Sequence, residues 1–322
     1  MEKLTKAEYF PISPLILRPD FKVPFDIFLR HDDSYVLFNA SGRTLTKAKR
    51  KELALAGVLT IYVDKRSRKL YHNYIRANLI DLLEDESISL VERAQAWTNA
   101  ASALSKELFE TNLPGPAFKK RYVRFQELIR SSTAFLKSPA PLKNLTQFIG
   151  KGYGTYHHGI STMVYAVNLM QEYKFEDDDV LACGMGALLH DIGQVGMDES
   201  LLNTDPETMA PAEFQAYAMH PLIGVRVCAN FGLPVIATNC ILFHHERVDG
   251  KGYPTQASGE EIPLPTRVVA LCNRYDDLTR NRPYSRAIKP FDALKALTDD
   301  KGLVEPDMIK RFIKLLSRAE IV

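Results

Sequence analysis

Histidine placement constrains this fold more than any other feature of the chain. Six of the eight histidines fall between residues 157 and 245. One of them, His190, is followed by Asp191 at the end of the apolar segment VLACGMGALL, which predicts a buried helix. Imidazole and carboxylate groups cost several kcal/mol to bury without a partner. A fold that buries this His-Asp pair must therefore bring other polar groups to it.

The remaining histidines are the nearest partners for this pair, and together they predict a metal site. The candidates are His158, His220, His244 and His245. Neutral imidazoles and a carboxylate bind divalent first-row metal ions, and one carboxylate can bridge two ions about 3.5–4 Å apart. A lone histidine at a helix end is more often a capping or core residue, so the prediction depends on the whole set. His157 has no such argument and is interpreted as a surface residue or as support behind the ligands.

Three regions of the chain differ in pattern. The pattern of residues 1–70 predicts a small α/β domain. The segment FDIFLRHDDSYVLFN is expected to form a hairpin, TLTKAKRKELALAG is expected to form a helix, and VLTIYVD is expected to form a strand. This region holds no cluster of nucleophiles or ligands, so we interpret it as a regulatory or interaction domain. Residues 71–144 are charged and helical in pattern and predict a helical linker. Residues 145–322 are almost wholly helical in pattern, so the chain is predicted to be mainly α.

Prolines divide the predicted linker. Pro114 and Pro116 end a first helical run, and a second helix is predicted over 118–137. The SPAP segment at 138–141 predicts a linker or turn. These helices and the N-terminal domain are our candidates for homodimer formation or for contact with a partner.

Composition excludes several classes of protein. Lys and Arg total 41 against 39 Asp and Glu, a net charge of +2, which argues against a nucleic-acid polymer or a membrane surface as partner. No apolar run approaches the roughly 20 residues of a membrane helix, and MEKLTKAEYFPISPL lacks the apolar stretch of a signal peptide. The four cysteines are widely spaced and form no CxxC pair. We therefore expect buried thiols in a cytoplasmic protein.

The order of the chemical motifs resembles the HD-GYP family, a branch of the HD metal-dependent phosphohydrolases. The motifs are His158, His190-Asp191, His220-Pro221, His244-His245-Glu246, Asp249-Gly250 and Gly252-Tyr253-Pro254. EEIPLPTRVVAL at 260–271, Leu278-Thr279 and Arg282-Pro283-Tyr284 extend the resemblance, which covers roughly 150–315. More weakly, the first 70 residues are similar to a small domain that often precedes HD-GYP modules.

The resemblance implies a helical HD bundle that binds metal ions, often iron or manganese, and cleaves cyclic di-GMP to pGpG or GMP. By this resemblance the metal ligands would be His158, His190, Asp191, His220, His244 and His245. Asp191 would bridge two ions, Gly252, Tyr253 and Pro254 would shape the rim of the substrate site, and Arg282 would meet a substrate phosphate. Two ions would screen the dianionic diester and lower the pKa of a shared water, so that hydroxide forms near neutral pH.

Four positions depart from the family pattern, and all lie at the site. Gln194 stands where the family has a lysine near the phosphate, and it keeps a hydrogen-bond donor without the charge. Asn273 stands where the family has a metal-binding aspartate, for which Asp276 or Asp277 could substitute. Gly154 replaces the glutamate of members that bind three metals, so two ions are predicted. Ser285 replaces a basic residue, with Arg286 adjacent.

These departures leave two main hypotheses. The first is a cyclic di-GMP phosphodiesterase with two divalent ions, iron or manganese, in which Asp191 and Gln194 lie at the reacting centre. The second is a degenerate HD-GYP protein that binds metal and cyclic di-GMP as a receptor or interaction module, with partners docking on the N-terminal domain or the GYP loop. A third is a phosphohydrolase that acts on another nucleotide. A metal-loaded protein without turnover would decide for the receptor.

Overall fold

A computed structural model describes the chain except for residues 1–7, 19, 33, 110–114 and 151–153. Pro114, predicted to end a helix, lies outside the described residues. The chain divides into two compact units, residues 1–100 and 101–322, which are described separately. Helix α4 (Leu90–Leu108) runs across this boundary.

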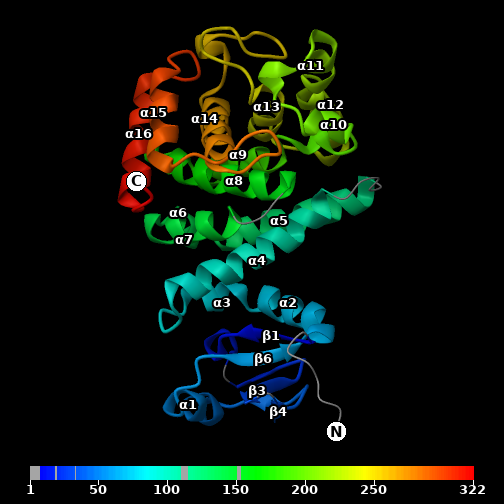
Figure 1. The fold of residues 1–322 in the computed structure, drawn as a ribbon, viewed down its shortest axis with the longest axis vertical. Helices are drawn as coiled ribbons and strands as arrows, with labels where there is room; N and C mark the ends of the chain where they lie inside the picture. The colour runs from blue at the N-terminus through cyan, green and yellow to red at the C-terminus, as the bar shows by residue number, and fades with distance from the viewer. Residues whose placement is uncertain (1–7, 19, 33, 110–114, 151–153) are drawn as a thin grey trace. The chain divides into compact units, whose positions relative to one another are not determined.

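The first unit is built on a four-stranded antiparallel sheet in the order β1-β6-β3-β4 (Figure 1). Its strands are β1 (Tyr9–Ile12), β6 (Ile61–Asp64), β3 (Ile27–His31) and β4 (Ser34–Asn39). The predicted hairpin and the final strand are confirmed, with His31 opposite Ser34 at the turn. A second, two-stranded sheet pairs β2 (Phe21–Lys22) with β5 (Thr44–Leu45).

Helices bury the apolar side chains of this unit. They are α1 (Lys47–Leu55), as predicted from sequence, α2 (Arg68–Ala77) and α3 (Leu79–Glu84). Tyr71 of α2 meets the rings of Phe10 and Phe25 edge-on, at centroid distances of 5.3 and 5.7 Å. Such aromatic pairs stabilise beyond their buried area, so the helix is fixed to the strands of its own unit.

The second unit is built from helices, which confirms the prediction of a mainly α chain. They are α5 (Gly115–Ser131), α6 (Thr133–Lys137), α7 (Pro139–Ile149), α8 (Thr155–Glu172), α9 (Asp177–Leu189), α10 (Glu199–Leu202), α11 (Pro211–Tyr217), α12 (His220–Cys228), α13 (Val235–Phe243), α14 (Leu264–Thr279), α15 (Pro290–Asp299) and α16 (Pro306–Arg318). No described helix combines the length and apolar character needed to cross a membrane.

Two expectations about the middle region were wrong in detail. The helix predicted over 118–137 is two helices, α5 and α6, which meet at Ser132. The residues predicted to form a linker at 139–141 are instead the first turn of α7, with Pro139 as its first residue. Proline fits there because the first helical N–H groups have no partner within the helix.

Helices α8 and α9 lie side by side at the centre of the second unit (Figure 1). The side chains of α8 from His158 to Met170 are all buried, and so are those of α9 from Val180 onward. Gly159 permits the close approach, because a Cβ atom there would lie 2.3 Å from the carbonyl oxygen of Leu188. This contact sets His158, which directly precedes Gly159, beside His190, which lies two residues after Leu188.

We expect Gly159→Ala to destabilise the protein by about 1–3 kcal/mol, since the added methyl overpacks a backbone contact. Gly184→Ala, on the facing helix, is the matched control: its Cβ would meet only side chains, with that of Val167 nearest at 2.9 Å, and no backbone. Urea unfolding followed by circular dichroism measures both changes. Equal destabilisation by the two variants would contradict the importance of the backbone approach.

Candidate metal centre

The side chains of the predicted site sit where helices begin or end, so that they converge on one point. His190 directly follows α9 and Asp191 follows it, while His220 is the first residue of α12. His244 and His245 directly follow α13. His158 comes from the first turn of α8. Helix ends leave these side chains free to point along the axis into a shared space, and Asn273 reaches the same space from the middle of α14.

One group of ligand atoms forms around one oxygen of Asp191. The Nε2 atoms of His158 and His190 are 3.2 Å apart, and Asp191 Oδ2 lies 3.8 and 3.4 Å from them. All three side chains are buried. We call His158, His190 and Asp191 the first ligand group.

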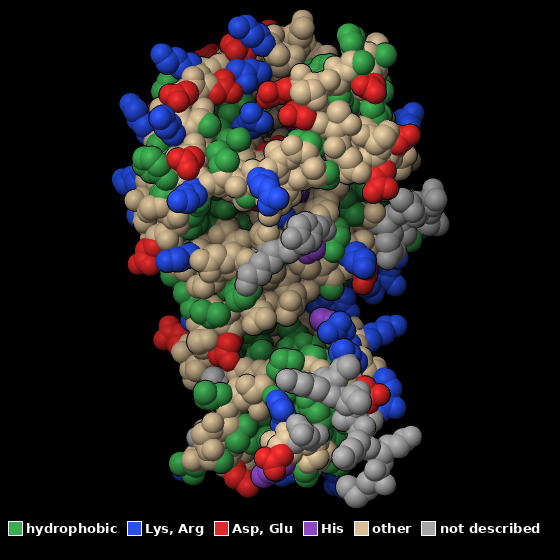
Figure 2. Space-filling model, in the orientation of Figure 1, with side chains coloured by type: hydrophobic (Ala, Val, Ile, Leu, Met, Phe, Trp, Pro, Cys, Tyr) green, Lys and Arg blue, Asp and Glu red, His purple; other side chains and the backbone are tan. Residues whose placement is uncertain are grey.

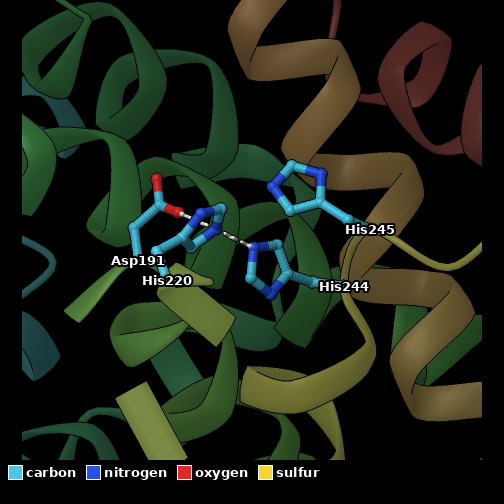
Figure 3. Close-up of side chains that lie close together, drawn as sticks. All are labelled: Asp191, His220, His244 and His245. Atoms are coloured by element: carbon cyan, nitrogen blue, oxygen red, sulfur yellow. Dashed lines mark hydrogen bonds and ion pairs between the residues drawn. The ribbon is translucent and has the colours of Figure 1, made fainter. Parts of the chain in front are cut away.

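The second ligand group, which consists of Asp191, His220, His244 and His245, forms around the other oxygen. Asp191 Oδ1 lies 3.3 Å from His220 Nε2 and 3.6 Å from His244 Nε2, and these two nitrogens are 3.1 Å apart. Figure 3 shows the four side chains pointing toward one another, with His245 across from Asp191. One ligand atom from each lies within 4.8 Å of the others. Asp191 thus belongs to both groups.

Hydrogen bonds on the outer side of three rings assign their protons. The Nδ1 atoms of His190, His220 and His244 each donate to a backbone carbonyl three residues earlier, at 2.6, 2.9 and 2.9 Å. A neutral imidazole has one N–H, so each Nε2 carries a lone pair directed at the centre. This outer hydrogen bond also fixes the ring, as is usual for metal-binding histidines.

Burial keeps most of these rings neutral. It lowers the pKa of His158 to about 4 and that of His244 to about 3. Burial acts to raise the pKa of Asp191, but the neighbouring histidines outweigh it and hold that pKa well below its usual range. Burial also acts to lower the pKa of His190, but the negative charge of Asp191 outweighs this effect, so the pKa of His190 is raised. The centre is therefore a carboxylate among imidazoles that attracts positive charge.

The donor set fits divalent metal ions. Lone pairs of nitrogen and oxygen face one another at 3.1–3.8 Å, and Asp191 Oδ1 accepts no well-aligned hydrogen bond from the described residues. Such an arrangement is unfavourable unless a cation lies between the lone pairs. Histidine nitrogens lie about 2.0–2.1 Å from a bound ion, so neighbouring ligands are about 3 Å apart, as the two Nε2 pairs are.

Helix α14 supports the first ligand group. Asn273 Oδ1 is 2.8 Å from His158 Nε2, so its neutral oxygen faces the centre. Asp276 lies on the opposite side of the same ring, where its Oδ2 is 2.7 Å from both His158 Nδ1 and Arg280 Nε. Asp276 therefore orients His158 from outside the centre. Sequence reasoning missed the role of Arg280, for which the only signal was its i,i+4 spacing from Asp276.

A cavity of about 580 Å³ opens beside the second ligand group. His244, His245, Gly252, Tyr253 and Arg282 line it, whereas Pro254 is not part of the lining. The Tyr253 ring stacks on His245, with centroids 4.5 Å apart and planes at 19°. The residues predicted to form the substrate rim, apart from Pro254, are thus beside the metal ligands.

The loop that carries Tyr253 is held in place by its neighbours. A Cβ atom on Gly252 would lie 2.5 Å from Glu246 Cα, so only glycine fits this approach. Glu246 is buried, and its Oε1 accepts hydrogen bonds from Thr255 N at 2.6 Å and Thr255 Oγ1 at 2.8 Å. Tyr253 is thereby fixed over His245, and its backbone N–H also donates to the carbonyl oxygen of His245 at 3.3 Å.

Gln194 lies near Asp191. It lines a smaller cavity of about 30 Å³ together with Asp191, Asn273, Asp277 and Arg282. Arg282 forms an ion pair with Asp277 in the same cavity. On the outer face shown in Figure 2, Lys and Arg side chains are interspersed with Asp and Glu over the second unit, in keeping with the near balance of charge.

Comparison with known proteins identifies the class. The HD domain family model matches residues 78–308, so the chain belongs to the HD domain family. The motif order described above resembles that of the HD-GYP branch of this family. The fold is similar to that of Bd1817, an HD-GYP-type protein of Bdellovibrio bacteriovorus, with a TM-score of 0.64 and 20% identity over 96% of this chain and 100% of that one.

Three curated relatives have named activities. A cyclic di-GMP phosphodiesterase of Pseudomonas aeruginosa is 29% identical over 184 residues, 57% of this chain and 44% of that protein. One of Thermotoga maritima is 33% identical over 150 residues, 46% and 40% of the two chains. A 3′3′-cGAMP-specific phosphodiesterase of Vibrio cholerae is 28% identical over 165 residues, which are 51% of this chain and 35% of that protein. This chain thus spans less than half the length of the curated relatives it matches.

Proposed function

We propose that this protein hydrolyses cyclic di-GMP to pGpG or GMP with two divalent metal ions, iron or manganese. The observation that carries the proposal is that the two oxygens of Asp191 face two separate sets of histidine lone pairs. His158, His190, Asp191 and Asn273 would hold one ion, and Asp191, His220, His244 and His245 the other. Bound divalent ions supply Lewis acidity and lower the pKa of coordinated water.

The chain's own residues would position the substrate. The cavity has a volume within the usual range for small-molecule sites, and its aromatic lining suits the flat purine bases. These aromatic residues are Phe214, Tyr217, Tyr253 and Tyr284. Arg282 would pair with a phosphate of the diester and stabilise the charge that develops there. Gln194, beside Asp191, would donate a hydrogen bond to the same phosphate.

The domain roles are part of the proposal. We assign regulation or partner binding to residues 1–70, a helical linker to 71–144 and the catalytic function to 145–322, with homodimer formation through the N-terminal domain or linker helices. Signalling proteins are the partners we propose for the N-terminal domain and the GYP loop. The four buried free thiols favour a reducing compartment, so we place the protein in the cytoplasm.

A second function is favoured by two residues. Gln194 and Asn273 each place a neutral side chain where the family pattern has a charged one. A reaction slows about tenfold for every 1.4 kcal/mol of lost transition-state stabilisation. A protein with these residues could retain metal and cyclic di-GMP without turnover, as a receptor. The relatives that are named for cGAMP extend the candidate substrates to other cyclic dinucleotides.

Chromatography of the products tests the proposal. The full chain, purified without oxygen and supplied with Fe²⁺ or Mn²⁺, is incubated with cyclic di-GMP and, separately, with 3′3′-cGAMP. We expect pGpG or GMP from cyclic di-GMP. Binding of cyclic di-GMP without product would establish the receptor instead, and cleavage of cGAMP alone would change the substrate.

A further inference from the structure

The first ligand group is short of negative charge. Its one carboxylate, Asp191, is shared with the second ligand group. Asn273 adds only a neutral amide oxygen, 2.8 Å from His158 Nε2. A divalent ion held by two imidazoles, an amide and half of a carboxylate keeps most of its charge uncompensated in a buried site, which is unfavourable.

Asp276 does not supply the missing charge. Its Oδ2 atom is 2.7 Å from His158 Nδ1, the nitrogen that points away from the centre. Arg280 holds the same carboxylate from the other side, through Nε at 2.7 Å and Nη2 at 3.3 Å. Both side chains are buried. Moving Asp276 into the centre would leave the Arg280 guanidinium buried without its counterion.

Asp277 is placed on the correct side. It follows Asn273 by four residues on α14, so the two side chains share one face of the helix. Its Oδ1 atom lies 3.7 Å from His158 Nε2, the nitrogen that carries the lone pair. That oxygen is buried and lines the cavity of about 30 Å³ that Asp191 and Asn273 also line. A cavity of this size holds a water molecule or an ion.

We infer that Asp277 is a metal-binding residue of this chain, which supplies to the first ligand group the carboxylate that Asn273 lacks. The inference rests on the two-ion centre proposed above. Asp277 also pairs with Arg282, so one carboxylate connects the ion to the arginine that we place at the substrate phosphate. Binding of an ion to Asp277 would weaken its hold on Arg282 and release that positive charge toward the substrate.

Metal content of matched variants tests the inference. The full-length protein and three variants are equilibrated with Mn²⁺, dialysed and analysed by plasma mass spectrometry, and Mn²⁺ affinity is measured by calorimetry. We expect two ions per chain in the unaltered protein and one in Asp277→Asn, or a second ion bound at least tenfold more weakly. Arg282→Gln should keep two ions, and Asn273→Asp combined with Asp277→Asn should regain two.

The outcomes separate this inference from the proposed function. Two ions bound to Asp277→Asn with unchanged affinity would overturn the role of Asp277, and so would loss of the same ion from Arg282→Gln. No bound ion in the unaltered protein would overturn the two-ion proposal as well. Two ions without hydrolysis would contradict the proposed activity and leave Asp277 as a ligand. If Asp277→Asn unfolds in thermal melts, Arg282→Gln decides through its Mn²⁺ affinity: tighter binding of one ion, because Asp277 no longer pairs with a cation, supports the inference, and unchanged affinity for both ions overturns it.

Discussion

Replacing Asp191 with alanine is expected to remove both metal ions and to lower cyclic di-GMP hydrolysis at least a thousandfold, about 4 kcal/mol in activation free energy. The reason is that one carboxylate serves both ligand groups, with Oδ2 toward His158 and His190 and Oδ1 toward His220 and His244. Without it, the second group would offer its ion only neutral imidazoles, and the first group would keep Asp277 as its single charged side chain. Plasma mass spectrometry counts the ions, and product chromatography measures the rate.

Asp178→Ala is the matched control for this experiment. Asp178 lies in the first turn of α9, the helix that ends two residues before Asp191, and its side chain is 82% exposed. We expect this variant to keep both ions and its rate. Circular dichroism should show retained helix in both variants. Unchanged metal content in Asp191→Ala would contradict the bridging role.

Arg282→Gln is expected to lower kcat/KM for cyclic di-GMP about a hundredfold, or 2.7 kcal/mol, and to leave the metal content unchanged. Charge-assisted hydrogen bonds to phosphate are about twice as strong as neutral ones, and Arg282 lines the cavity beside the metal ligands. Its ion pair with Asp277 keeps the guanidinium beside the centre, and an ion bound to Asp277 would free it for the phosphate. Steady-state kinetics on the metal-loaded protein measure the loss.

Lys251→Gln provides the comparison at the same cavity. Lys251 lines the cavity at its rim and is exposed, so water already screens its charge. We expect less than a threefold effect from this change. Equal losses from the two variants would show that the cavity attracts the substrate through its general charge, and that Arg282 has no specific phosphate contact.

The residues of the two candidate ligand groups could be selected from the sequence because their types and positions are unusual. Six histidines in one helical region, one of them beside Asp191 after an apolar helix, can be recognised without coordinates. The hairpin of β3 and β4 and the helix α1 were predictable in the same way, because the hydrophobic patterns that indicate them are local in the sequence. The break between α5 and α6 at Ser132 was not, because the pattern of apolar residues continues through it, and the start of α7 at Pro139 was not, because the two prolines of SPAP are typical of a turn.

The support for the ligands could not be predicted, because it depends on packing between distant residues. His158 and Asp276 are 118 positions apart, and they meet only because α14 packs against α8. The same packing decides that Asp276 lies outside the centre and Asp277 inside it, although the two are adjacent in sequence. Gly159 likewise looks like an ordinary helix glycine in the sequence, because its contact with the carbonyl oxygen of Leu188 exists only in the folded structure.

Activity as a function of bound metal tests the two-ion centre most directly. Metal-free protein is titrated with Mn²⁺ or Fe²⁺ without oxygen, and cyclic di-GMP hydrolysis is measured at each ratio of metal to chain. We predict that the rate rises until two ions are bound per chain and then remains constant. A rate that reaches its maximum at one ion, or hydrolysis that is independent of added metal, would contradict a centre in which Asp191 joins two ions.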